Sequence, residues 1–255
     1  MNPKPRRRWL IALPLVLIVL GGAGLIWFFG RDVPEEASID AATSLTTSTA
    51  DNVTAGGSET TGSSASLTAF IPDGEWVIDT SIGDFSFTEA TASFAGFRVN
   101  EELSGIGATT AIGRTPELEG RLDIEDGIVT AGSVEADLTA IVSNESRRDD
   151  RIQSALNTSS NPIASFVLNE EIELPSGLVE GSTFTVEAVG DLTVNGITNP
   201  VVIPLEGAIA NGGVLLAGGV EIVFAEYDVV VPRAPVVLSA EDHGILEVQL
   251  WFTRA

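Results

Sequence analysis

The sequence contains no cysteine, and it has only one histidine among its 255 residues. Without cysteine there is no thiol nucleophile, no disulfide framework, no lipid-modified cysteine anchor and no Cys-based zinc or iron–sulfur site. A single histidine leaves carboxylates as the remaining metal ligands, and the spacing of a calcium-binding loop is missing. We therefore expect no metal and no cofactor.

Basic residues are also scarce, with 13 Lys and Arg against 36 Asp and Glu. Four of the basic residues, Lys4, Arg6, Arg7 and Arg8, precede the first apolar run, so the rest of the chain has nine against all 36 acidic ones. Such a surface repels phosphate backbones, which excludes nucleic acid as an expected partner and favours a role of the charge in solubility.

A long apolar run near the N-terminus extends from Leu10 to Phe29 without a charged residue. At about 1.5 Å rise per residue, a helix of this length crosses the hydrocarbon core of a bilayer. We predict a transmembrane anchor at residues 10–30, with the basic residues 1–9 in the cytoplasm and the C-terminal domain outside it. A cleaved signal peptide is the alternative, but the run is longer than usual for one and Trp27-Phe28-Phe29 is a poor cleavage site.

Residues 31–70 are rich in Ser, Thr, Ala, Gly and acidic residues. This composition buries too little apolar surface to offset the loss of chain entropy on folding, so we predict a flexible linker. The remaining residues, 71–255, have the size of one ordinary domain.

Alternating apolar and polar residues predict β-strands throughout this domain. The apolar positions of the predicted strands are Phe85 and Phe87; Leu118, Leu122 and Ile124; Val134, Ala136, Leu138, Ala140 and Val142; Phe184, Val186, Ala188, Leu192 and Val194; Val220, Ile222 and Phe224; and Leu246, Val248, Leu250 and Phe252. Seven or eight strands result. The dipeptides Asp126-Gly127 and Asn195-Gly196 are typical of tight hairpin turns and predict antiparallel neighbours.

One segment has helical spacing: Ser146 is a predicted N-cap, and Ile152 and Leu156 lie four residues apart on one face. An antiparallel all-β domain of this size forms a sandwich or closes into a barrel, and the pattern alone does not distinguish the two.

Several motifs, in order along the domain, resemble the YceI-like family of polyisoprenoid-binding proteins. The domain opens on Trp76-Val77-Ile78-Asp79-Thr80, similar to the W-x-I-D start of that family, and Asn161-Pro162-Ile163-Ala164-Ser165-Phe166 is similar to its Y-P-x-x-x-F. The segment from Gly190 to Val201 resembles the G-x-L-T-x-x-G-x-T-x-P hairpin, with Asn199 in place of a usual basic residue.

The resemblance implies a lipocalin-like antiparallel β-barrel of about eight strands with one short helix, and an apolar interior that holds an isoprenoid-type lipid such as a quinone or a polyprenyl chain. We expect the lining to come from large apolar side chains on the dry faces of the strands, although each of them could simply fill the core. The expected lining residues are Phe85, Phe87, Leu138, Phe166, Phe184, Val186, Leu192 and Phe224.

Two arginines of the predicted helix, Arg148 and Arg151, are candidates to contact a polar headgroup, and the alternative is a solvated helix face with local ion pairs. His243 has Ser239 and Asp242 nearby in sequence, but no nucleophile-elbow motif is present, and we expect a binding protein and not an enzyme. The alternative function is a structural or protein-interaction barrel without a lipid. The sequence leaves a homodimer open.

Overall fold

The computed structural model describes residues 34–43 and 69–255 except 86, 88–90, 144–145 and 233–234. The predicted anchor at 10–30 and most of the predicted linker lie outside the described residues. None of the helices within those described ranges has the length and apolar composition required to cross a bilayer.

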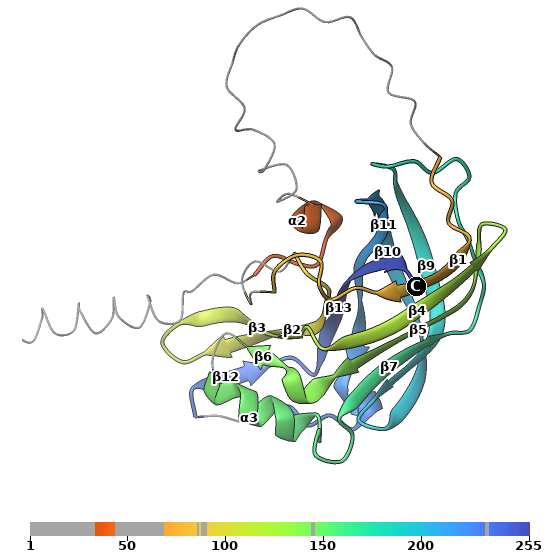
Figure 1. Ribbon diagram of the computed structural model, residues 1–255. Helices are drawn as coiled ribbons and strands as arrows, with labels where there is room; N and C mark the ends of the chain where they lie inside the picture. The colour runs from red at the N-terminus through yellow and green to blue at the C-terminus, as the bar shows by residue number, and fades with distance from the viewer. Residues whose placement is uncertain (1–33, 44–68, 86, 88–90, 144–145, 233–234) are drawn as a thin grey trace, which may run out of the picture.

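Eight antiparallel strands form a closed barrel in the order β1-β4-β5-β7-β9-β10-β11-β13, and β13 pairs with β1 to complete the ring (Figure 1). These strands are β1 (Gly74–Ile78), β4 (Leu118–Glu125), β5 (Ile128–Asp137), β7 (Ile163–Leu168), β9 (Thr183–Val194), β10 (Ile197–Ala210), β11 (Gly213–Val223) and β13 (His243–Arg254). The short strand β8 (Ile172–Glu173) adds to β5. The prediction of an all-β barrel of about eight strands is confirmed.

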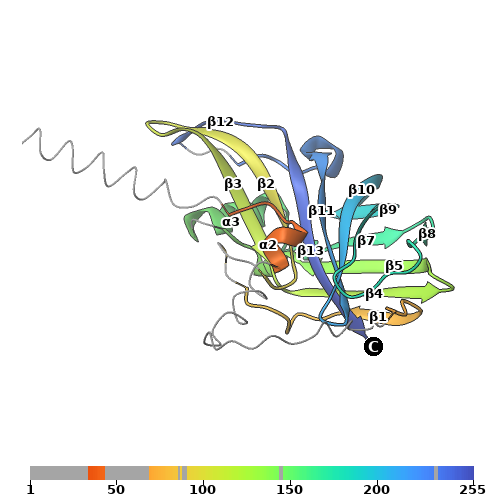
Figure 2. The same cartoon turned by 90° about the horizontal axis from the view of Figure 1, so that it is seen from above.

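A second group of strands extends the sheet away from the ring, as Figure 2 shows from above. It consists of β2 (Phe94–Leu103), β3 (Gly107–Thr115), β6 (Val142–Ser143) and β12 (Val237–Ala240). The first residues of β13, 245–249, pair with β2, whereas its last residues, 252–254, pair with β1. One end of the barrel is therefore closed by β1, and the sheet departs from the ring at the other end.

The two predicted hairpin turns join β4 to β5 and β9 to β10. Asp126 and Asn195 have φ of 51°, and the glycine that follows each has φ of 77° and 75°, respectively. Two successive residues with positive φ form the type I′ turn whose twist matches the flanking strands, which is why Asx-Gly occupies both turns.

The closed end of the barrel is packed around Trp76, which is fully buried with Phe252 beside it in the main core. Its indole nitrogen donates a hydrogen bond to the Pro72 carbonyl at 2.6 Å, and the Phe70 ring lies 5.4 Å from its own ring. The side chain of Arg254 covers the indole face at 5.0 Å. This end of the barrel is therefore filled by side chains.

Two strand predictions were wrong. Phe85 and Phe87 lie in the connection between β1 and β2 and belong to no strand. The alternation from Val134 to Val142 does not continue as one strand either, because the chain turns into a 3₁₀-helix, η1 (Leu138–Ala140). The Asp137 carboxylate accepts a hydrogen bond from the Thr139 amide and caps that helix, a local interaction that competes with strand pairing.

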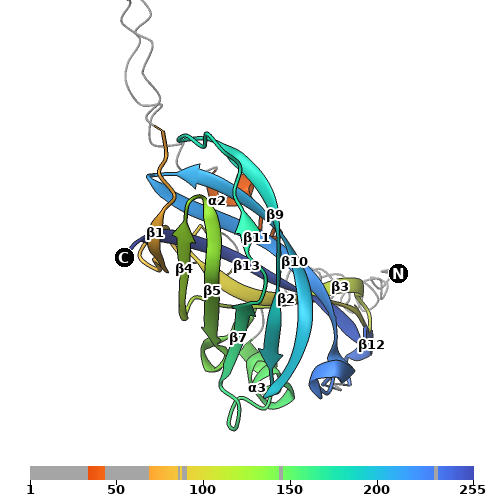
Figure 3. The same cartoon turned by 90° about the vertical axis from the view of Figure 1, so that its right-hand side faces the viewer.

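The helix predicted around residues 146–156 is α3 (Ser146–Ala155). Its apolar positions pack against the open end of the barrel, where Ile152 is buried with Leu138 and Ile141. In Figure 3, α3 covers that end of the barrel below β5 and β7. A second 3₁₀-helix, η2 (Phe224–Tyr227), follows β11.

Part of the predicted flexible linker is folded, which corrects the prediction for residues 34–43. This segment, the N-terminal strap, contains the short helix α2 (Ile39–Thr43) and lies on the outer face of the barrel. Ile39 and Ala42 are buried against Leu215, Ala217 and Trp251. The composition argument missed this contact because the strap has few apolar residues. Those residues are covered by a patch of the barrel that lies 170 or more positions later in the sequence.

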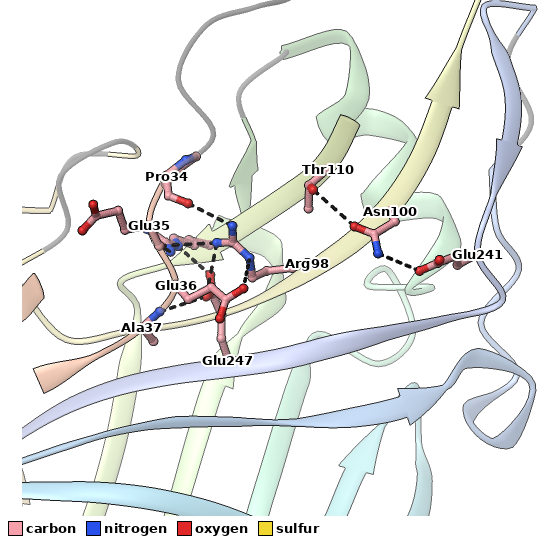
Figure 4. Close-up of polar contacts among 10 residues, drawn as sticks. Pro34, Glu35, Glu36, Ala37, Arg98, Asn100, Thr110, Glu241 and Glu247 are labelled. Atoms are coloured by element: carbon pink, nitrogen blue, oxygen red, sulfur yellow. Dashed lines mark hydrogen bonds and ion pairs between the residues drawn. The ribbon is translucent and has the colours of Figure 1, made fainter. Parts of the chain in front are cut away.

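A buried ionic cluster holds the strap in place (Figure 4). Arg114 and Glu247, each 2% exposed, pair at 2.7 Å, and Arg98 lies 3.5 Å from the same carboxylate. The two guanidinium groups donate to the carbonyls of the strap: Arg98 to Pro34 at 2.9 Å and Arg114 to Glu35 at 2.6 Å. The Glu247 carboxylate accepts from the Ala37 amide at 3.2 Å, so the cluster binds the strap backbone through both donors and acceptors.

Replacing Trp76 should destabilise the barrel. Trp76→Ala removes a fully buried indole from the closed end and is expected to lower the free energy of unfolding by about 3–5 kcal/mol, as measured by urea denaturation. Val77→Ala, next to it but 38% exposed, should cost less than about 1 kcal/mol. Equal losses in the two variants would contradict the assigned burial.

Removing Arg98 should release the strap without unfolding the barrel. Arg98→Ala deletes the hydrogen bonds to Pro34 and Glu35, and charge-assisted bonds of this kind contribute about 1.5–3 kcal/mol each. Amide hydrogen exchange of residues 37–43 should accelerate about tenfold or more, while the strands stay protected. Arg121→Ala, whose side chain is 67% exposed on the outer wall, serves as the control and should leave the strap protected.

Candidate functional site

The barrel interior holds two apolar chambers. The larger, about 190 Å³, lies beside α3, and the smaller, about 120 Å³, lies within the ring of strands and is lined by residues of β4, β5, β7, β9, β10, β11 and β13. Both chambers are lined by Ala95, Ala136, Ala164 and Leu246, which form the junction between them. Three of these four side chains are alanines, so small side chains form most of the boundary that the chambers share, and the two volumes together reach the lower end of the ~300–1,000 Å³ range of ligand pockets.

Two aromatic rings that line the chambers lie over glycines on the neighbouring strand of the sheet. Phe184 of β9 is paired across the sheet with Gly207 of β10, and Phe97 of β2 with Gly113 of β3. A Cβ atom at Gly207 would lie 2.3 Å from the Phe184 ring, and one at Gly113 would lie 2.6 Å from the Phe97 ring. Each glycine thus provides the space for a ring that would otherwise project into a chamber.

The larger chamber reaches the surface at an opening between α3 and β12, which we call the mouth. Its lining includes Arg151, which is exposed, as well as Arg148 and Glu101. Arg148 donates to the Glu101 carboxylate at 2.6 Å, with 22% and 7% of the two side chains exposed. Because Glu101 is paired with Ala240 of β12, this ion pair connects α3 to the other side of the mouth.

The structure places six of the eight predicted lining residues along these chambers. Leu138 and Phe224 line the larger chamber, and Phe166, Phe184, Val186 and Leu192 line the smaller one. Phe85 and Phe87 line neither, since they lie in the connection outside the ring of strands. The predicted headgroup residues Arg148 and Arg151 both lie at the mouth.

Sequence reasoning missed two features of the site. The alanines at the junction gave no signal because a small apolar residue in a strand is also an ordinary core residue. The pairs of phenylalanine and glycine are visible only when the cross-strand register is known, and Phe184 and Gly207 are 23 positions apart.

Two positions depart from the family motifs, Asn161 where an aromatic residue is common and Asn199 where a basic residue is usual, and both have structural roles. Asn161 donates a hydrogen bond to the Asn195 side chain at 3.0 Å, and Asn199 donates to the Glu226 carbonyl at 2.9 Å. Asn195 in turn donates to the Tyr227 carbonyl at 3.1 Å. The bonds of Asn195 and Asn199 tie the β9–β10 hairpin to η2, and the bond of Asn161 ties the segment before β7 to the same hairpin. Within η2, Tyr227 is 1% exposed and burial raises the pKa of its hydroxyl.

His243 lies on the outside of the barrel, away from both chamber linings. Its ring is 3.0 Å from the Asp242 carboxylate, and Glu241 and Glu221 lie 3.6 Å and 4.0 Å away. The hydrogen bond to Asp242 raises the pKa of His243 and lowers the pKa of Asp242. An imidazole among three carboxylates favours the protonated form, which is a poor general base.

No group of His, Asp and Glu arranged to hold a metal ion occurs within the described part of the chain. The side chains that line the two chambers are almost all aliphatic or aromatic, with the charged groups confined to the mouth. The arrangement is suited to binding an apolar molecule by exclusion of water, with polar recognition at one end.

Eight antiparallel strands around an apolar interior that opens at one end define a lipocalin-like β-barrel. Residues 76–251 match the model of the YceI-like domain, and the chain belongs to that family. No curated protein sequence matches the chain.

Solved structures share this fold at low sequence identity. The polyisoprenoid binding domain from Saccharophagus degradans, implicated in plant cell wall breakdown, is 13% identical with a TM-score of 0.52, and the match covers 71% of this chain and 98% of that one. BcnA of Burkholderia cenocepacia is 14% identical with a TM-score of 0.49, over 62% of this chain and 94% of that one.

Enlarging Gly207 should reduce the smaller chamber. In Gly207→Ala the new methyl group displaces the Phe184 ring from the wall into the chamber, because the three atoms nearest to that position all belong to the ring. We expect the uptake of a long-chain isoprenoid to fall about tenfold or more, measured by titration of ligand fluorescence or by extraction and mass spectrometry. The double variant Gly207→Ala with Phe184→Leu restores space and should recover binding. Unchanged uptake in the single variant would contradict a ligand in the smaller chamber.

Proposed function

We propose that the protein is a membrane-anchored extracytoplasmic carrier that holds an apolar isoprenoid-type lipid, a quinone or a polyprenyl chain, inside its barrel for sequestration or transfer. The observation that carries this proposal is the pair of adjoining apolar chambers that reaches the surface at a mouth with two arginines. The related domain from Saccharophagus degradans, described as polyisoprenoid-binding, supports the same ligand class.

The chambers supply the affinity for the apolar chain. Each methylene transferred from water to such an interior contributes roughly 0.8 kcal/mol, so a few isoprene units give a large gross affinity before the costs of ordering the chain and the protein. The small alanine side chains at the junction leave space for the methyl branches of an isoprenoid chain.

The mouth supplies the polar contacts. Arg148 and Arg151 carry guanidinium donors at the end of the larger chamber, and quinone carbonyls or the oxygens of a polyprenyl headgroup are acceptors for such donors. Glu101 partly neutralises Arg148, which favours a headgroup of low charge.

The residues of the chambers and the mouth support a role in binding and not in catalysis. His243 is on the outer surface, and the chamber linings offer apolar contacts in place of an acid–base pair. The alternative of a purely structural barrel predicts a filled interior, and the two chambers favour the carrier instead. The proposal of a membrane anchor is based on the uncharged run from Leu10 to Phe29.

The first test is the content of the protein as purified. We expect the full chain, solubilised in detergent from a bacterial host, to release an isoprenoid lipid on extraction in near-stoichiometric amount, identified by mass spectrometry. A protein that is empty and stays empty when quinones and polyprenols are offered would exclude the carrier and favour the structural barrel.

Arg151 at the mouth should contribute to the affinity only of ligands that have a headgroup. Arg151→Gln is expected to weaken binding of a quinone about threefold to tenfold, a partial effect because the side chain is exposed. Binding of squalene, an isoprenoid hydrocarbon without a headgroup, should not change. Arg121→Gln, on the outer wall, is the matched control for the loss of one positive charge, and equal effects on quinone and squalene would contradict headgroup recognition at the mouth.

A further inference from the structure

Four large aliphatic side chains are exposed on β12, on the segment before it and on the adjoining β2–β3 turn, and we call them the apolar rim. Val230 is 72% exposed, Leu238 62%, Val236 51% and Ile106 37%. Ile106 lies in the β2–β3 turn, and the other three residues lie between η2 and the end of β12. The two places are neighbours, because the Ser104 amide of the turn donates to the Val236 carbonyl at 2.8 Å. The strand β12 pairs with the end of β2 at the same place.

Among the described residues around β12, valines and a leucine occupy both the inward and the outward face. Val229, Val231 and Val237 line the larger chamber, whereas Val230, Val236 and Leu238 point to the outside. The inward residues are explained by the chamber. The outward residues expose apolar surface beside its opening, a feature that marks an interaction surface on a protein that otherwise has abundant charge.

The first residues of the strap are the ones that lie nearer to the rim. Its first described residue, Pro34, is held by Arg98, whereas Ala37 is held by Glu247, which is paired with Gly96 of β2. Along β2, Arg98 is closer than Gly96 to Leu103, the residue paired with β12 at the rim. The strap therefore runs away from the rim with increasing residue number, as the positions of Pro34, Ala37 and Asn100 in Figure 4 illustrate.

Chain length then limits where the predicted anchor can end. Residue 30, the end of that anchor, is four residues from Pro34, a span of at most about 14 Å. Arg98 is five residues from Leu103, roughly 17 Å along a strand. A docked strap thus keeps the end of the apolar run within about 14 Å of Pro34, slightly less than the distance to the rim, whereas a free linker of about 40 residues would have a root-mean-square reach of roughly 35 Å.

We propose that the apolar rim is a membrane-contact surface, and that the strap orients the barrel with its mouth against the lipid bilayer. This inference rests on the proposed function, because a ligand that passes between the bilayer and the larger chamber through the rim avoids exposure of its chain to water. Glu102 and Glu241 lie beside β12 and offset the positive charge of the exposed Arg151 at the mouth, so the surface it fits is a neutral or zwitterionic bilayer.

The lack of cysteine makes the contact directly measurable. The full chain is reconstituted into phosphatidylcholine vesicles with one environment-sensitive fluorophore attached in the variants Val230→Cys or Leu238→Cys. Matched controls are Val167→Cys and Val202→Cys, which replace valines 48% and 46% exposed on β7 and β10. Brominated phosphatidylcholine then reports which labels touch the acyl chains.

We expect severalfold stronger quenching at the two rim positions than at the two wall positions, and loss of the difference in the Arg98→Ala background, where the strap is released. Equal quenching at all four positions, or none at the rim, would overturn the inference, and rim labels that respond only to an added protein would assign the surface to a protein partner instead.

A second measurement separates this inference from the proposed function. In Val230→Asn with Leu238→Asn, the transfer of an isoprenoid quinone from phosphatidylcholine vesicles should slow about tenfold or more, because two aliphatic contacts with the bilayer are lost. The amount of quinone bound at equilibrium in detergent should be the same as in the parent chain and in Val167→Asn with Val202→Asn. Unchanged transfer with normal binding overturns the rim contact alone, whereas absent binding in the parent chain overturns the carrier.

Discussion

The pairing of β13 with three neighbours is the constraint on which the rest of the structure depends. It pairs with β11 over most of its length, with β2 through its first half and with β1 through its last residues. The change of partner along a single strand closes the barrel around Trp76 at one end and leaves the other end to α3 and β12. Barrel closure satisfies the backbone groups of the ring, so the interior is apolar without an exposed sheet edge.

The two faces of β13 then serve different purposes. Its inward residues Leu246, Val248 and Leu250 line the smaller chamber, and its outward residues Glu247 and Trp251 hold the strap. A buried carboxylate on the outside of a barrel is costly unless it is paired, and Arg114 and Arg98 supply that pairing. The ionic cluster therefore specifies one docking position for the strap, since only a backbone with correctly placed carbonyl and amide groups completes its hydrogen bonds.

An open interior needs side chains that are large enough to exclude water yet do not fill the space. The barrel meets both requirements by laying phenylalanine rings against glycines, as at Phe184 and Gly207, and by placing alanines where the chambers meet. The charged groups remain at the mouth, where Arg148 keeps its partner Glu101 and part of its solvation. Affinity for an apolar chain and recognition of a polar end are thereby assigned to different parts of one cavity.

The sequence by itself determined the all-β class, the two Asx-Gly hairpins, the helix α3 and the family, because strand alternation, turn conformation and short motifs are local properties. It also indicated six residues of the chamber lining, three of them on β9, where the large apolar residues of the dry face point inward. Only the tertiary structure decided that Phe85 lies outside the barrel, that the chambers are open, and that residues 34–43 are docked. These features depend on contacts between distant positions, such as Ala37 with Glu247 across 210 residues, and no local pattern encodes a contact of that range.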